Sequence, residues 1–324
     1  MRTKLALLLF LLATFSLISL ALGTAEITHV WSYVINPFHQ ADSSSHQIIW
    51  EIRAPRIAAA LLIGSCLGIA GVLAQGSTNN PLADPAILGT SAGASLGVVI
   101  GVLLNAVTIG SAGAVLFAAI GALLATLLTF SLARSALQLI TIGIGVAAIL
   151  TAIVGLSLSM ISRPDARSVS FWSFGSLALV TPAMLAVLLP VLVIGAFLAW
   201  KIAPSVDLLS LGDESVRHIG YDPQKIRLRS FVLLSTLIAV TVSSVGSIAF
   251  LALAAPHIAR FIVGPQNRKL VIFAAAVGAM ILLVADTAAR ALVPPNELPI
   301  GLLTSLIGAP ILILTLKRGG DIWR

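Results

Sequence analysis

Residues 53–93 place charge toward the two ends of a long segment, with an uncharged middle. Arg53 and Arg56 precede an apolar stretch, and the next charged residue is Asp84. The run Asn-Asn-Pro-Leu-Ala-Asp-Pro at 79–85 predicts a break, because Asn-Pro favours a turn and a residue before proline avoids helical geometry. A second apolar run, rich in Gly and Ser, follows. The segment therefore predicts two apolar helices joined by a tight turn, with a middle compatible with lipid.

Composition extends this interpretation to the whole chain. Of 324 residues, 58% are hydrophobic and only 10% are charged, and the mean hydropathy is +1.07. A soluble domain carries about 25% charged residues, so this chain lacks the polar groups that a water-facing surface needs. The net charge of +7 does not indicate nucleic-acid binding, because the basic residues are scattered between apolar runs instead of forming a patch. The sequence predicts an all-α integral membrane protein.

We predict about ten membrane-spanning helices in one domain comprising residues 1–324. The eighth is short for a span, which suggests a buried or tilted segment. The first follows Arg2 and Lys4 and is long enough to span, so we favour an uncleaved helix over a signal peptide, although Gly23-Thr24-Ala25 resembles a cleavage site. The predicted spans are 4–23, 57–76, 86–104, 111–133, 137–160, 183–200, 231–250, 254–264, 269–287 and 300–316.

The distribution of Lys and Arg predicts the orientation. If the N-terminus is cytoplasmic, 14 of the 19 basic residues lie inside. Both termini then lie in the cytoplasm and the number of spans is even. The five basic residues placed outside are Arg53, Arg56, Arg163, Arg167 and Arg290.

Three connections are long enough to carry a function. The outer segments 24–56 and 161–182 contain Trp31, Trp50 and Phe171-Trp172, which fit an interfacial aromatic belt or contacts with a cargo. In the inner connection 201–230, acids after Gly212 indicate a helix start, Gly220 its end, and Asp222-Pro223 the start of the next helix. This short helix is either a docking site for a partner or part of a solvated loop.

Several catalytic and binding motifs are missing from the sequence. There is no G-x-x-x-x-G-K-[ST] phosphate loop, and none of the five lysines follows a glycine. Gly64, Gly68 and Gly71 lie within an apolar run and predict close helix packing. Asp286 and Arg290 are four residues apart and predict a pair on one helix face. We predict no bound cofactor, no metal site and no enzymatic activity of the chain itself; Cys66 in an apolar run is a predicted buried residue, and His39 and His46 lack acids or cysteines at ligand spacing.

Five blocks together resemble the iron-siderophore, haem and cobalamin permeases of bacterial ABC importers, the FecCD type. They occur in the family's order and cover nearly the whole chain. One departure is Ala252-Leu253, where the family has Gly-Leu before its Pro-His pair. The blocks are residues 53–93, 171–177, 209–220, 246–260 and 286–310.

The resemblance implies a fold and a set of partners. The expected fold is cobalamin-permease-like, with ten transmembrane helices and a cytoplasmic coupling helix between helices six and seven. The expected partners are a second permease copy forming a homodimer, two cytoplasmic ATPase subunits and an extracytoplasmic substrate-binding protein, in the bilayer of the bacterial inner membrane. The implied cargo is an iron(III)-siderophore chelate, with haem or cobalamin as the alternative.

The resemblance also implies roles for individual residues. Arg53, Arg56 and Arg290 match arginines that receive acids of the binding protein, although headgroup contacts or a local pair such as Arg53 with Glu51 are alternatives. Asn80 and Leu82 match the turn that narrows the cytoplasmic end of the pathway, and Ser135 borders the same gate. The expected ATPase-coupling residues are Leu211, Gly212, Asp213, Glu214, Arg217 and Gly220.

Two functions of other classes remain open from the sequence. An ion-coupled secondary transporter would need a midplane acid or a broken-helix ion site, and the acids that approach the membrane core are few. A non-transporting membrane scaffold or sensor is the other. A membrane enzyme has less support, because no nucleophile–base or metal constellation is present.

Overall fold

The computed structural model describes residues 1–23, 27, 30–35, 44–86, 88–109, 111–133, 135–160, 172–178, 180–294 and 296–318. The predictions for His39, Arg163, Arg167 and Phe171 lie outside these residues. Within them the chain is helical and contains no β-strand. The elements are α1 (Arg2–Ala21), α2 (Val30–Ile35), α3 (Ser44–Gln47), η1 (Ile48–Arg53), α4 (Ala54–Thr78), α5 (Thr90–Leu103), α6 (Ala112–Leu132), α7 (Ala136–Met160), α9 (Pro182–Leu208), η2 (Leu209–Leu211), α10 (Asp213–His218), α11 (Pro223–Val245), α12 (Leu251–Val263), α13 (Asn267–Ala291) and α14 (Ile300–Arg318).

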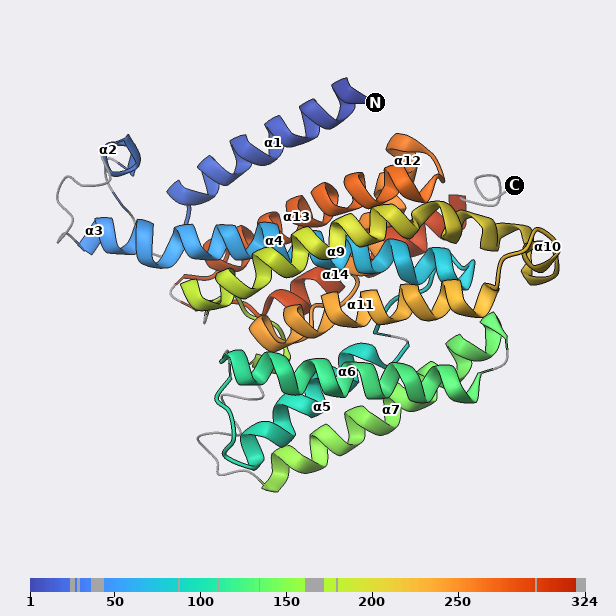
Figure 1. Ribbon diagram of the computed structural model, residues 1–324. Coiled ribbons are helices and arrows are strands. Elements are labelled where there is room, and N and C mark those ends of the chain that lie inside the picture. Colours follow the sequence, from blue (N-terminus) through green and yellow to red (C-terminus); the bar gives the residue numbers. More distant parts are fainter. Residues whose placement is uncertain are drawn as a thin grey trace.

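The apolar helices run roughly side by side along one long axis (Figure 1). Among the described residues, seven apolar helical segments are long enough to cross a membrane. Three shorter apolar helices occur at 90–103, 251–263 and 300–310. This pattern fits a multi-pass membrane protein, and each predicted span corresponds to one of these segments.

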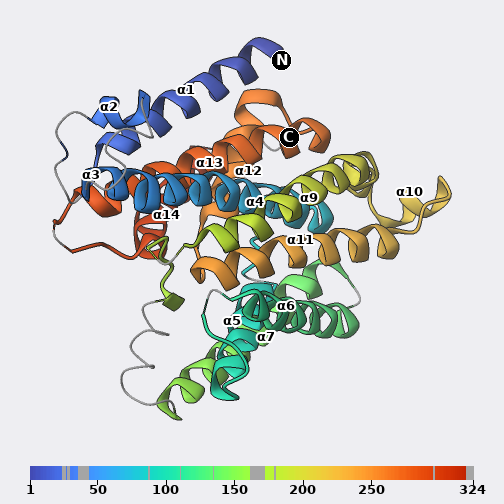
Figure 2. The ribbon, with the colours of Figure 1, turned by 60° about the vertical axis from the view of Figure 1, so that its left-hand side comes forward.

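Helices α4, α11 and α13 form the interior of the bundle, whereas α1, α6, α7 and α9 are mostly exposed. Helices α5, α6 and α7 form a group on one side of α11, and α1 lies on the opposite side beside α13 (Figures 1 and 2). Because all these helices are apolar, their hydrophobicity does not determine which are buried. Small residues, which let helix backbones approach closely, favour an interior position.

The glycines of α4 lie where other helices approach its backbone. A Cβ atom on Gly64 would meet the backbone of Gly278 in α13, and one on Gly68 would meet Ala274. A Cβ atom on Gly71 would collide with the backbone of Ala252 in α12. The predicted packing role of these glycines is therefore confirmed.

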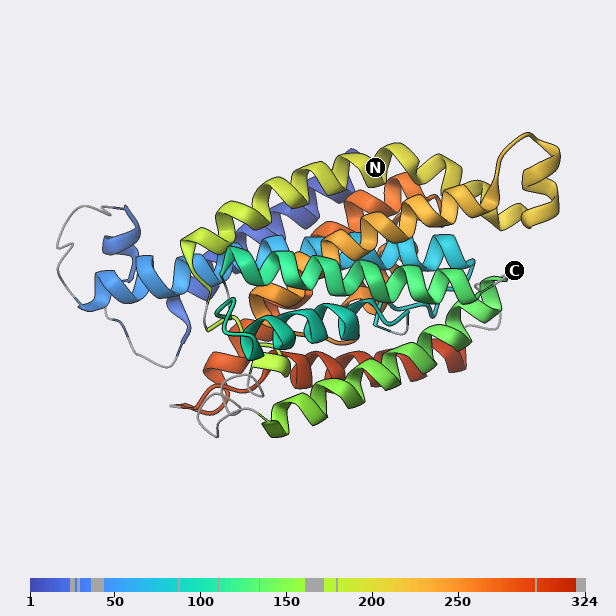
Figure 3. The same ribbon diagram turned by 60° about the horizontal axis from the view of Figure 1, so that its bottom comes forward.

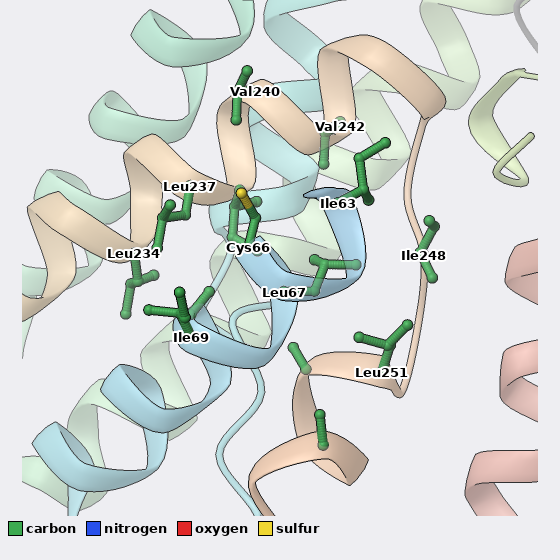
Figure 4. Packing of buried hydrophobic residues seen from close by; sticks show 14 of the residues in the cluster. Ile63, Cys66, Leu67, Ile69, Leu234, Leu237, Val240, Val242, Ile248 and Leu251 are labelled. Atoms are coloured by element: carbon green, nitrogen blue, oxygen red, sulfur yellow. The ribbon is translucent and has the colours of Figure 1, made fainter. Parts of the chain in front are cut away.

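The interior around α4 is apolar and closely packed. Cys66 is fully buried, as predicted, in a cluster with Ile63 and Ile69 of α4 and Leu234 and Leu237 of α11 (Figure 4). This contact between α4 and α11 is continuous along the middle of the bundle, so movement at one end of α4 is opposed by packing in its centre.

Buried hydroxyl groups connect α5, α6 and α11. Thr126 of α6 lies 3.1 Å from the Thr90 hydroxyl of α5 and 2.7 Å from the Ser235 hydroxyl of α11. Hydroxyl pairs of this kind join helices in an environment where hydrophobic burial contributes little to association. The group α5–α7 is thereby attached to the interior through polar contacts as well as packing.

Two helix boundaries differ from the prediction by eight residues. Helix α9 continues past the predicted end at 200 to Leu208, and α11 begins at Pro223 instead of 231. Both extensions are polar, so hydropathy marks the part of the helix that fits in lipid and misses the rest. The start of α11 follows the Asp222 cap, whose carboxylate accepts from the backbone of Gln224 and Lys225.

Three of the blocks that carry the family resemblance meet in one backbone junction. Ser176 donates to the carbonyl of Val245 at 2.9 Å, and Ile300 donates to the carbonyl of Gly175 at 3.0 Å. Gly246 has φ 77°, and a Cβ atom there would collide with the carbonyl of Trp172. Trp172 is buried in this junction, so the prediction that it belongs to an interfacial belt is wrong.

The bundle has two distinct ends. Helices α2 and α3 project from one end, which we call the α3 end, and α10 projects from the other, the α10 end (Figure 3). The N-terminus lies toward the α10 end, and α14 runs in that direction (Figures 1 and 3). Every predicted site residue lies near one of these ends, so each end is described in turn.

Candidate functional site

A cluster of four charged side chains closes the α3 end of the interior; we call Arg56, Asp286, Arg290 and Glu297 the arginine cluster. Arg56 donates through Nη2 and Nε to Oδ1 of Asp286, at 2.8 and 3.2 Å. Its Nη1 donates to both carboxylate oxygens of Glu297, at 2.7 and 2.9 Å. One guanidinium group is thus shared between two carboxylates that come from different elements.

Arg290 completes the cluster from the other side of Asp286. Its Nε donates to Oδ2 of Asp286 at 3.0 Å, which confirms the pair predicted from their spacing. Its other nitrogens donate to Oγ of Ser19 and the carbonyl of Leu22, both at 2.9 Å. Asp286 therefore receives two arginines and is completely buried. Such a carboxylate is stable in a membrane protein only because both partners stay in place.

Arg53 lies beside the cluster and binds the end of α1. It donates to the carbonyls of Leu20 and Ala21 at 2.7 and 3.1 Å. Together with Arg290 it satisfies carbonyls that the last turn of a helix leaves without partners. In the described part of the chain, no ion pair joins Arg53 to Glu51, the alternative partner. The peripheral helix α1 is thereby attached to α4 and α13.

The three arginines predicted to dock a binding protein do lie together, but they are buried. Arg53, Arg56 and Arg290 are 2%, 4% and 3% exposed, and their nitrogens donate within the chain. Glu297, whose side chain is 29% exposed, is the member of the cluster that water reaches. The docking role stays a prediction. An acid of a binding protein could reach Arg56 only by displacing the partly exposed Glu297.

At the opposite end, α4 stops in the turn predicted at 79–82, which we call the 79–82 turn. Asn79 has a left-handed backbone (φ 49°) that ends the helix, as Asn tolerates well. The side chain of Asn80 accepts from the backbone of Leu82 at 2.9 Å and tightens the turn. Ser135 caps the start of α7, where its hydroxyl accepts from Gln138 at 3.3 Å. Among the described residues, Ser135 forms its hydrogen bond within α7 and not with the turn, and the gate role of Asn80, Leu82 and Ser135 remains a prediction.

The short helix expected in the inner connection is present as α10. Gly212 (φ 86°) precedes it and Gly220 (φ 86°) follows it, so glycines set both ends. Its first residue, Asp213, forms a bidentate pair with Arg227 of α11, with both N–O distances 2.7 Å. Hydrogen bonding from Arg227 lowers the pKa of Asp213 below that of an ordinary aspartate.

The outer surface of α10 and its neighbours mixes apolar and charged side chains. Ile219 and Tyr221 are each half exposed, and Val216 on the inner face is buried. Exposed apolar side chains at the tip of a protruding segment are typical of an interaction surface. The predicted coupling residues on this surface are Leu211, Gly212, Glu214, Arg217 and Gly220, all exposed, whereas Asp213 is half buried.

An open cavity of about 900 Å³ separates the 79–82 turn from the end of α9. Asn79 and Asn80 line one wall, and Asp207 and Arg260 line others. Asp207 accepts from the backbone and side chain of Asn267, at 3.0 and 2.9 Å, and so ties the end of α9 to the start of α13. The turn therefore borders open space on the side that faces α9.

Sequence reasoning missed two residues that organise these ends. It identified Glu297 only as part of a motif and assigned no role to Arg227. Glu297 binds Arg56, which lies 241 residues earlier in the chain, and Arg227 contacts Ser77, which lies 150 residues earlier. Within the described residues there is no group of three His, Cys, Asp or Glu that could hold a metal ion.

Comparison with known proteins gives a consistent result. The model of the FecCD transport family matches residues 8–318. The iron(3+)-hydroxamate import permease FhuB of Bacillus subtilis is 35% identical over 86% of this chain and 73% of its own length. The hemin transport permease HmuU of Yersinia pestis is 34% identical over 84% of each chain. The vitamin B12 import permease BtuC of Vibrio cholerae is 33% identical over 78% of this chain and 77% of its own length.

Solved structures agree with the sequence relatives. A chain described as an inward-facing metal-chelate type ABC transporter has a TM-score of 0.87 and 28% identity, and covers 98% of this chain and 100% of its own. The PsaBC structure from Streptococcus pneumoniae, with a TM-score of 0.64 and 14% identity over 88% of this chain and 95% of its own, shares the fold alone.

Proposed function

This chain belongs to the FecCD transport family, and we propose that it is the permease subunit of an ATP-driven importer for an iron(III)-siderophore chelate. The observation that carries the proposal is the arrangement of its two ends. One end presents α10 with exposed apolar side chains, and the other presents the arginine cluster with one accessible carboxylate. A permease that binds an ATPase at one end and a loaded binding protein at the other needs a contact surface at each end.

The proposed orientation places the α10 end in the cytoplasm of the bacterium, in its inner membrane. The excess of Lys and Arg in the segments on that side supports this orientation. Helix α10 then acts as the coupling helix for one of two ATPase subunits, and the 79–82 turn acts as the cytoplasmic gate. A second copy of the chain completes the pathway, and a binding protein docks at the α3 end.

The cargo class rests on the relatives. Permeases for ferric hydroxamates, haem and vitamin B12 are all similar to this chain at 33–35% identity. The relative at 35% identity is a hydroxamate permease, which is why a siderophore chelate is proposed first. Haem and cobalamin are the alternatives.

Reconstitution tests both the class and the cargo. The permease is placed in proteoliposomes with an ATPase subunit that copurifies with it, and a binding protein that docks on it is added outside with a radio-iron ferric hydroxamate. We expect uptake that requires ATP and the binding protein. Parallel arms with haem and cobalamin rank the cargoes. Uptake driven by an ion gradient without the ATPase would contradict the proposal and support a secondary transporter.

A further inference from the structure

Arg227 is a buried side chain that touches two segments of different proposed function. It lies near the start of α11 and is 3% exposed. Its Nη1 and Nη2 donate to the carboxylate of Asp213, the first residue of α10. Its Nε donates to the backbone carbonyl of Ser77, in the last turn of α4, at 3.1 Å. One planar group therefore bridges the base of α10 and the end of α4.

The contact at Ser77 lies immediately before the 79–82 turn. Ser77 precedes Asn79 by two residues, and the backbone of Asn80 still donates to the carbonyl of Gln75 at 3.1 Å. The last turn of α4 and the 79–82 turn are thus one hydrogen-bonded unit. A displacement of the Ser77 carbonyl changes the position of Asn80.

The attachment of α10 to α11 is stiff. Val216 is fully buried against Val206, Leu209 and Ile226, so α10 rests on a small apolar cluster of its own. The two bonds between Arg227 and Asp213 are short and parallel, which fixes orientation as well as distance. By contrast, Asp207 ties the end of α9 to α13 and does not reach the turn. In the part of the chain that the structure describes, Arg227 is the hydrogen-bonded connection between α10 and α4.

We propose that Arg227 is a positioning residue that transmits the movement of α10 to the 79–82 turn. This inference rests on the proposed function, in which α10 receives the ATPase and the turn is the gate. A shift of α10 pulls on the Asp213 carboxylate, the rigid guanidinium follows, and the Ser77 carbonyl moves with it. The cavity beside the turn leaves room for this movement. Arg227 would contact neither ATP nor cargo.

The test measures gate opening and ATP hydrolysis in the same preparation. Leu82→Cys is introduced in a Cys66→Ala background, and the permease is assembled with its ATPase in lipid nanodiscs. Labelling of the introduced thiol by a charged maleimide is timed without nucleotide and after trapping with ATP and vanadate. In this parent we expect the labelling rate to change about tenfold between the two states.

Arg227→Gln in this background should reduce that change to less than about twofold, while ATP hydrolysis continues. A purely structural role would lower hydrolysis and gate response together. Lys225→Gln is the matched control, because Lys225 forms only an exposed pair with Asp222 at 3.8 Å on the same helix. Asp213→Asn is the second variant. The Asp213 carboxylate is partly exposed, and removing its charge leaves the bond between Arg227 and Ser77 intact.

The outcomes separate the inference from the proposed function. A normal gate response in both Arg227→Gln and Asp213→Asn overturns the inference alone. A loss of response in Asp213→Asn with ATP hydrolysis retained supports it even if Arg227→Gln fails to fold. A parent permease that binds no ATPase overturns the proposed function, and the inference falls with it.

Discussion

The two ends of the bundle each use arginine, but they hold it in opposite ways. At the α3 end, Arg56 and Arg290 share the fully buried carboxylate of Asp286. At the α10 end, Arg227 holds a single carboxylate, that of Asp213, whose side chain is 35% exposed. Removing a partner leaves an unpaired carboxylate without water at the first end, whereas water can reach the carboxylate of Asp213 at the second. The α3 end is therefore built as a fixed anchor, and the α10 end as a movable joint whose carboxylate water can reach.

This difference agrees with the work that each end is proposed to do. A surface that receives a binding protein needs a constant shape, and the arginine cluster ties α1, α4 and α13 into one unit there. A segment that responds to an ATPase needs two positions of similar free energy. The single bidentate pair between Arg227 and Asp213, with one partner partly exposed, keeps α10 attached to α11 in both positions.

The largest effect is expected for Asp286→Asn, which tests whether the α3 end is a fixed anchor. The substitution keeps the shape of the side chain but leaves Arg56 and Arg290 without their shared charge in a buried site. We expect a loss of about 3–5 kcal/mol of stability, and a fall in Tm in detergent of about 10 °C. Glu297→Gln is the control, because both arginines keep Asp286 and the altered side chain is partly hydrated. A Tm equal to that of the wild type would show that the α3 end is not an anchor.

Local patterns in the sequence predicted much of this geometry. The pair of Asp286 and Arg290 followed from their spacing on one helix, and the limits of α10 followed from Gly212 and Gly220. Close packing against α4 followed from glycines in an apolar run, although not which helices pack there. The first two predictions depend on neighbours within a few residues, where helical periodicity determines which side chains meet.

The contacts between distant segments could not be predicted in this way. Arg56 meets Asp286 across 230 residues, and Arg227 meets Ser77 across 150. Topology placed Arg53, Arg56 and Arg290 outside the membrane, but it contains no information on burial. The sequence therefore did not predict that these three arginines are buried in an internal hydrogen-bond network.

The second test asks whether a binding protein docks on Arg56 at the α3 end. Glu297 occupies Nη1 of Arg56 with both oxygens, so an acid of a binding protein would have to compete with it. We expect Glu297→Gln to tighten binding of the binding protein about tenfold, equivalent to about 1.4 kcal/mol. Binding is measured by titration of the permease in nanodiscs.

Glu51→Gln is the matched control for that titration, because Glu51 is exposed near the same end and is not part of the arginine cluster. A general effect of negative charge on docking would appear in both variants. Equal affinity of Glu297→Gln and the wild type would rule out competition at Arg56 and leave the three arginines with a structural role only.

The smallest effect concerns the pH dependence of the joint. Arg227 lowers the pKa of Asp213, so the pair contributes stability above the ordinary aspartate pKa and loses it only as pH falls through the lowered folded value. The difference in Tm between wild type and Asp213→Asn should therefore stay constant from about pH 8 to about pH 5, because aspartate ordinarily titrates near 3.9. It should shrink only in more acidic buffer. A difference that disappears between pH 7 and pH 5 would mean that another titrating group holds α10, and the joint would then be a pH switch instead of a mechanical one.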